Sequence, residues 1–226
     1  MGDLQHMTTA RGPFEPRFDE LPKEIPIFPL GSALLLPGGR LPLNIFEPRY
    51  LAMVRDAVSN PLRLIGMVQP MNDAGSGSLY SLGCAGRISS FQESDDGRIL
   101  ITLMGISRFH LNTAREVEDG YLLADIDWSQ FESDLIPQDN ADIDRNGLLR
   151  VLRHYFDVRG FSVDWEQLES CENERLVTSL SMICPFDEAE KQALLEAPKL
   201  EDRAQLLSAI LEMAVHAEDE DSRATH

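Results

Sequence analysis

A strand that turns abruptly into a helix is encoded by Leu41-Pro42-Leu43-Asn44-Ile45-Phe46-Glu47-Pro48-Arg49-Tyr50. Apolar side chains alternate with proline and asparagine over residues 41–45, which is the pattern of a strand with one buried face. Because Pro42 cannot donate a ladder hydrogen bond, this strand is expected at a sheet edge or at a strand end. Residues 49–58 then predict a helix, and Pro48 suits its first turn, where a missing N–H costs nothing.

The same corner contains four of five candidate binding residues. We expect the Phe46 side chain to pack where the strand meets the helix, and the Glu47 carboxylate to favour the positive helix end. Arg49 is expected to pair with Glu47 or with a carboxylate of another strand, and Tyr50 offers a ring with one polar tip. Arg108 is the fifth candidate, as a supporting charge. Two interpretations stay open: the motif is a folding corner, or part of it lines a groove for exposed polypeptide.

Around the corner, short β-rich runs alternate with Gly, Pro and Asn turns. The predicted strands cover residues 24–28, 33–36, 41–45, 63–69, 83–91, 98–104, 108–112 and 121–127. A polar, glycine-containing loop is expected at residues 71–78, where it is a candidate gate for the groove. Short strands with one early helix predict a small, strongly bent or barrel-like sheet.

After residue 137 the apolar period becomes helical. Helices are predicted over residues 142–156, 172–183, 188–196 and 200–214, and Asp187 with Glu190 forms a capping-box pattern at the start of the third. Strands followed by helices predict an α+β fold. The expected division is a disordered tail at 1–21, a β domain at 22–136, a helical subdomain at 137–217 and an acidic tail at 218–226.

Charge and cysteine content narrow the function classes. Lys and Arg number 20 against 38 Asp and Glu, a formal net charge of −18, and no basic cluster offsets it in the sequence. Such a field repels phosphate backbones, so nucleic-acid binding is disfavoured. Residues 1–17 lack the apolar core of a secretory signal, and no apolar run approaches membrane-spanning length. Three scattered cysteines without a CxxC pair fit a reducing cytoplasm.

Several stretches resemble one known family. The residues 26–30, 35–38 and 41–50 resemble the opening of the Lon protease substrate-binding domain, in which an apolar P-L strand and a P-G turn precede L-P-L-x-I-F-E-x-R-Y. The family's glycine-led strand, hairpin turn, G-x-x-R junction and helical tail are similar to residues 83–88, 97–98, 105–109 and 190–196. The resemblance implies an α+β fold: a PUA-like bent antiparallel β-sheet or barrel, followed by an α-helical bundle. It also implies a stand-alone module that recognises substrates or adaptors without the ATPase and peptidase domains.

Catalytic and metal-binding patterns are missing from the sequence. None of the three lysines, Lys23, Lys191 and Lys199, belongs to a phosphate-loop motif, and the histidines show no ligand spacing. We therefore expect no cofactor, no metal and no catalytic residue. The expected function is non-catalytic binding of unfolded polypeptide or a protein partner. Two alternatives stay open: a small hydrolase in the β domain, for which Cys84 and His110 are the one nameable pair, and a regulatory subunit that docks through its helical tail.

Overall fold

The strand–helix corner lies at one end of the sheet in the computed structural model, which describes residues 16–71, 78–136 and 141–224. Strand β2 (Arg40–Ile45) leads into helix α1 (Pro48–Ser59). Glu47 is the N-cap residue in extended conformation, and Pro48 occupies the first helical turn as predicted. The predicted loop at 71–78 falls mostly on residues 72–77, which lie outside the described residues.

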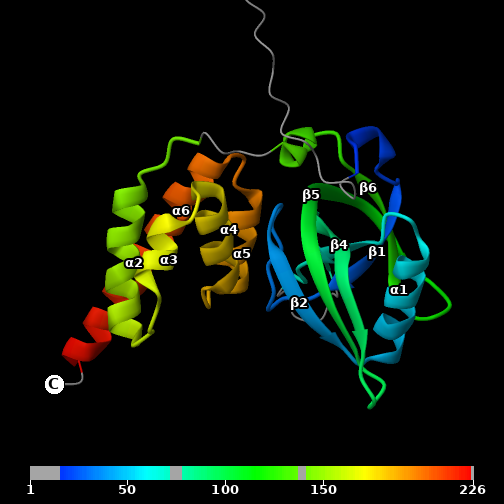
Figure 1. Ribbon diagram of the computed structural model, residues 1–226, viewed down its shortest axis with the longest axis horizontal. Coiled ribbons are helices and arrows are strands. Elements are labelled where there is room, and N and C mark those ends of the chain that lie inside the picture. The colour runs from blue at the N-terminus through cyan, green and yellow to red at the C-terminus, as the bar shows by residue number, and fades with distance from the viewer. Residues whose placement is uncertain (1–15, 72–77, 137–140, 225–226) are drawn as a thin grey trace, which may run out of the picture.

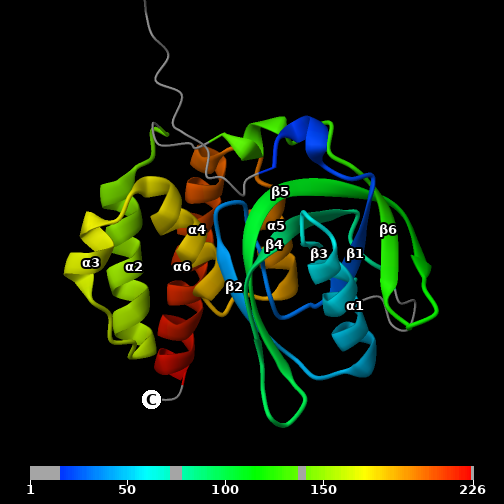
Figure 2. The ribbon, with the colours of Figure 1, turned by 45° about the vertical axis from the view of Figure 1, so that its right-hand side comes forward.

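The other strands complete one six-stranded sheet in the order β2-β5-β4-β3-β1-β6, in which β6 also pairs with β5 (Figures 1 and 2). They are β1 (Glu24–Pro29), β3 (Leu64–Val68), β4 (Leu82–Glu93), β5 (Ile99–Glu116) and β6 (Leu122–Asp127). The sheet predicted as antiparallel is mixed: the other strand pairs are antiparallel, but β1 and β3 pair in parallel. The chain between them crosses over through β2 and α1, and a parallel pair requires such a crossover.

Two further predictions in this region are wrong. Residues 33–36 do not form a strand. They lie in the loop between β1 and β2, where Leu34, Leu35 and Leu36 are buried. The predicted strands 98–104 and 108–112 are one strand, β5, which begins at Ile99 and passes through Gly105 without a break. Register shifts against β4 and β6 bend this long strand, so it pairs with β2, β4 and β6 along its length.

Helices α2 (Arg145–Arg159), α4 (Asn173–Ile183), α5 (Glu188–Glu196) and α6 (Leu200–Ala224) form the second part beside the sheet (Figure 1). The capping box of Asp187 and Glu190 is present as predicted. A short helix, α3 (Trp165–Ser170), was not predicted; its N-cap, Asp164, accepts a hydrogen bond from the backbone N–H of Gln167. Helix α6 continues ten residues beyond its predicted end at 214, and so extends into the predicted acidic tail.

The described residues before β1 pack against the sheet. Within the predicted tail at 1–21, Phe18–Glu20 form a 3-10 helix, η1, and Phe18 packs on the apolar cluster inside the sheet. A second and larger apolar cluster is continuous from the sheet into the helices. The buried leucines of the loop at 34–36 belong to it, so this loop joins the two parts of the protein.

Candidate functional site

Phe46 is the exposed apolar side chain of the strand–helix corner. Its side chain is 63% exposed, so the prediction that it packs into the corner is wrong. The strand turns into the helix at this point, and the alternation that buries Ile45 directs Phe46 outward. The corner therefore presents an aromatic ring to solvent.

The other three corner residues contact one another. The Arg49 Nε donates to Glu47 Oε2 over 3.0 Å, which is one of the two pairings expected from the sequence, and the Arg49 guanidinium lies 4.5 Å from the centre of the Tyr50 ring. Tyr50 is only 7% exposed and its ring lies 4.3 Å from that of Phe28. Burial raises the pKa of the Tyr50 hydroxyl. Tyr50 thus anchors α1 in the core, and the ion pair covers its outer side.

Strand β2 provides a free edge next to Phe46. It stands at one end of the strand order and pairs with β5 alone among the strands that the structure describes. Pro42 and Asn44 are exposed along it, and Pro42 thus occupies the edge position predicted for it. Leu100 of β5 pairs in register with Asn44 and is 42% exposed. We call the free edge of β2, with Phe46 and Leu100, the edge surface.

Arg108 is not part of the edge surface. It lies on β5, where its Nε and Nη2 donate to the two carboxylate oxygens of Asp134 over 2.9 and 2.7 Å. Its Nη1 and Nη2 also donate to the carbonyl oxygens of Ala197 and Pro198, between α5 and α6, over 2.7 and 3.1 Å. The structure therefore brings together four of the five predicted residues and leaves Arg108 buried between the sheet and the helices.

Arg203 of α6 is a second buried arginine at this junction. Its Nε donates to the carbonyl oxygen of Leu194 over 2.8 Å. Burial, with a further contribution from the nearby charge of Arg108, lowers the pKa of Arg203 to about 10. Both guanidinium groups donate to backbone carbonyls at the end of α5, so Arg108 ties this helix to β5 and Arg203 ties it to α6.

The pair Cys84 and His110 lacks the arrangement of an activated nucleophile. Cys84 is fully buried in β4, and this burial raises the pKa of its thiol far above the usual range. The His110 ring packs against Phe131 at 5.1 Å between ring centres. Within the described residues, no group of three or more His, Cys, Asp or Glu side chains is placed to hold a metal ion. No described helix combines the length and the apolarity needed to cross a membrane.

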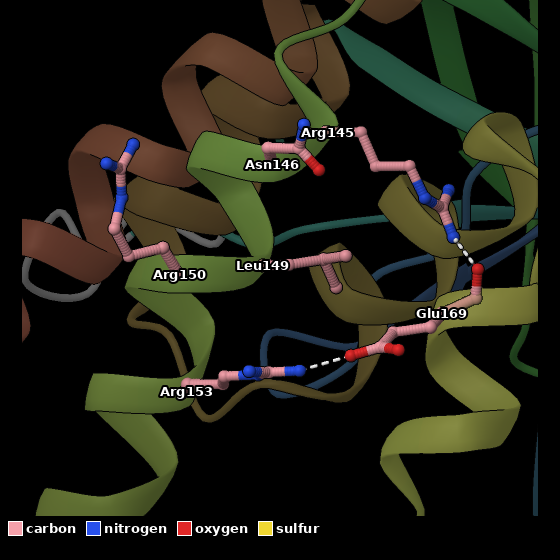
Figure 3. Close-up of a pocket in the computed structure, with 6 residues that line it drawn as sticks. All are labelled: Arg145, Asn146, Leu149, Arg150, Arg153 and Glu169. Carbon is pink, nitrogen blue, oxygen red and sulfur yellow. Dashed lines mark hydrogen bonds and ion pairs between the residues drawn. The ribbon is translucent and has the colours of Figure 1, made fainter.

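An arginine-lined cavity on α2 and α3 was missed at the level of sequence. It has a volume of about 550 Å³, and Figure 3 shows its lining of Arg145, Asn146, Leu149, Arg150, Arg153 and Glu169. The expectation that no basic cluster offsets the acidic charge is therefore wrong at this point. The available signal was the spacing of Arg145, Leu149 and Arg153, which places residues four apart on one face of a helix.

The chain is similar to known proteins over most of its length. The model of the ATP-dependent protease La (LON) substrate-binding domain matches residues 24–213. Lon protease 2 of Myxococcus xanthus is 26% identical over 204 residues, which cover 85% of this chain and 24% of that protein. Lon protease of Desulfosudis oleivorans is 33% identical over 95 residues, 40% of this chain and 12% of that protein. The chain thus spans about a quarter or less of the length of these two relatives.

Two solved structures have the same fold. The Lon N-terminal domain protein from Xanthomonas campestris superimposes with a TM-score of 0.58 at 23% identity, over 82% of this chain and 97% of that one. The N-terminal domain of a Mycobacterium avium complex Lon protease gives a TM-score of 0.58 at 14% identity, over 84% and 98%. These similarities confirm the predicted α+β fold. Since the family model matches far more than half of its residues, the chain belongs to the family of the Lon substrate-binding domain.

Proposed function

We propose that this protein is a non-catalytic polypeptide-recognition module, and that it binds an extended segment of another chain along the edge surface. The family to which it belongs is described as substrate-binding, which supports the general role. The observation that carries the location is the 63% exposure of Phe46 beside a strand edge that pairs on one side. An aromatic ring next to unpaired backbone groups suits an extended polypeptide.

The binding mode follows from the composition of β2. An added strand hydrogen-bonds to the free backbone groups of the edge, while its side chains contact Phe46 and Leu100. Pro42 offers a carbonyl but no N–H, so the edge is a weak template for continuous pairing. Affinity therefore depends on burial of the two apolar side chains, and an aromatic residue buries roughly 150–250 Å². We expect preference for extended, apolar-rich segments over folded proteins.

The non-catalytic part of the proposal rests on the chemistry of the best nucleophile candidate. A thiol whose pKa burial raises is held in its unreactive form, which is the opposite of what catalysis requires. Arg108, which the sequence suggested as a supporting charge, has its donors engaged within the fold. We expect binding without turnover and without a cofactor.

The experiment that tests this proposal is binding of fluorescently labelled casein, an extended polypeptide, by the full chain with and without Phe46→Ser. We expect about tenfold weaker binding, because the substitution removes the main apolar contact. Ile183→Ser is the matched control, since Ile183 is 79% exposed at the end of α4 and outside the edge surface. Equal binding by the wild type and Phe46→Ser, or an equal loss in the control, would contradict the proposal.

A further inference from the structure

The arginine cavity on α2 and α3 concentrates positive charge in an acidic chain. Helix α2 carries four arginines, and three of them, Arg145, Arg150 and Arg153, line the cavity. Glu169 of α3 is the one acidic residue among the six lining residues. The local charge is therefore opposite in sign to the formal net charge of −18.

Two of these arginines are held in place by the fold. Arg145 donates to Asn173 Oδ1 over 2.7 Å and to the backbone carbonyl of Glu169 over 2.9 Å. Arg153 pairs with the Glu169 carboxylate, and its guanidinium lies 5.0 Å from the centre of the Trp165 ring. These contacts fix the positions of two guanidinium groups before any ligand arrives, which lowers the entropy lost on binding.

Arg150 differs from its two neighbours. Its side chain is exposed, and it forms no hydrogen bond or ion pair with the side chains described at residues 16–71, 78–136 and 141–217. In Figure 3 its guanidinium points away from Glu169, on the opposite side of α2 from the Leu149 side chain. The cavity thus combines two positioned cations with a third whose hydrogen-bonding capacity is available to a ligand.

We propose that this cavity binds the carboxylates of a short acidic segment in a partner polypeptide, at a surface distinct from the edge surface. The planar guanidinium matches a carboxylate with two parallel hydrogen bonds, and Arg150 provides that fork. A volume of about 550 Å³ lies within the range of protein ligand sites, about 300–1,000 Å³, and accommodates a few side chains. Leu149 contributes an apolar contact at the centre of the lining.

The overall charge favours an acidic peptide over a nucleic acid. Charges are screened within about 8 Å at physiological ionic strength, so a ligand confined to the cavity interacts mainly with its arginines. A nucleic-acid strand carries a phosphate at each nucleotide and continues past the cavity. Outside the cavity it would meet a protein whose net charge is negative, which repels phosphate. A peptide can restrict its carboxylates to the cavity.

The test measures binding of a fluorescein-labelled oligo-glutamate peptide to the full chain by fluorescence anisotropy. Arg150→Gln is expected to weaken binding about tenfold, because it removes a charge-assisted hydrogen bond. Arg55→Gln is the matched control, since Arg55 is an exposed arginine on α1. Oligo-glutamine should not bind, and added salt should weaken the oligo-glutamate complex.

A second readout is the intrinsic emission of Trp165, which contacts Arg153 at the wall of the cavity. The peptide should change this emission in the wild type and not in Arg150→Gln. In Phe46→Ser the peptide should change the Trp165 emission as it does in the wild type, which separates this cavity from the edge surface proposed to bind casein. The inference is overturned by an absence of peptide binding, by an equal loss in Arg55→Gln, or by a single-stranded oligonucleotide that displaces the peptide at lower concentration than unlabelled oligo-glutamate does.

Discussion

Arg108 of β5 and Asp134 of the 3-10 helix η2 (Glu132–Leu135) form a buried ion pair, with Arg108 Nη2 and Asp134 Oδ1 2.7 Å apart. The Asp134 carboxylate also accepts a hydrogen bond from the Arg108 backbone N–H over 2.9 Å. The same guanidinium reaches the backbone carbonyls that follow α5. One arginine therefore links the sheet, the connection out of the sheet and the helical part.

Arg108→Met should destabilise the protein by about 3–5 kcal/mol, because the substitution leaves the Asp134 carboxylate buried without its partner. Urea denaturation followed by circular dichroism measures the loss. Arg98→Met is the control, since Arg98 pairs with Asp96 on an exposed hairpin and such pairs contribute about 0–1 kcal/mol. Similar losses in the two variants would show that the buried pair does not stabilise the junction.

Tyr50→Ala and Phe46→Ser should separate the structural residue of the corner from the surface residue. Tyr50→Ala removes a buried ring in contact with Phe28 and should cost about 3–5 kcal/mol. Phe46→Ser should change the free energy of unfolding by no more than about 0.5 kcal/mol, because its ring is mostly in water. Urea midpoints measure both, and a large loss in Phe46→Ser would mean that Phe46 supports the fold.

Gly105→Ala should be poorly tolerated, with a cost of about 3 kcal/mol or more. A Cβ at this position would lie 2.0 Å from the carbonyl oxygen of Leu36, and the backbone there is tied to Gly105 by two hydrogen bonds through Gly38 and Gly39. Gly97→Ala is the control. A Cβ at Gly97 would meet open space, and the φ of Gly97 is 81°, so only about 1 kcal/mol of backbone strain is expected. Thermal unfolding of the two variants tests the difference, and equal melting temperatures would exclude the close approach.

Tyr121 should titrate late in the folded protein. Burial and the 2.6 Å hydrogen bond that its hydroxyl donates to Asp56 raise its pKa to about 12. Since the usual value is about 10, the folded state holds this proton more tightly, and its contribution to stability is present below pH about 10 and lost as pH rises towards 12. Asp56→Asn should lower the Tyr121 pKa, as measured by ultraviolet absorbance against Tyr121→Phe. An unchanged titration in Asp56→Asn would mean that burial alone raises it.

Much of the fold followed from local patterns. The alternation in β2, the position of Pro48 at the start of α1 and the capping box of Asp187 and Glu190 were each predictable, because neighbouring residues determine them. The order of strands before helices, together with the family motifs, predicted the α+β architecture that the solved structures share. The predicted first and last residues of α1, α4 and α5 lie within one residue of the observed ones. Each of these helices is bounded by a proline, a capping residue or the end of the helical spacing of apolar residues.

Long-range packing accounts for the rest. Leu34, Leu35 and Leu36 have the composition of a strand, yet they form a loop that is buried in the apolar cluster shared by the sheet and the helices, while β2 pairs with β5. Burial of Arg108 depends on η2 and on the α5–α6 connection, which are distant in sequence. The alternation along β2 directs Phe46 away from the side that buries Ile45, but whether another segment covers its ring depends on tertiary packing.

Sequence alone thus predicted most of the helices and strands, their order and the family resemblance, because these depend on residue spacing and on motifs that are continuous along the chain. The parallel pairing of β1 with β3, the free edge beside Phe46 and the arginine cavity on α2 and α3 emerged only from the three-dimensional arrangement. Each of these features is a relation between segments that fold against one another. Their energies depend on burial and charge proximity in space, which local sequence patterns do not encode.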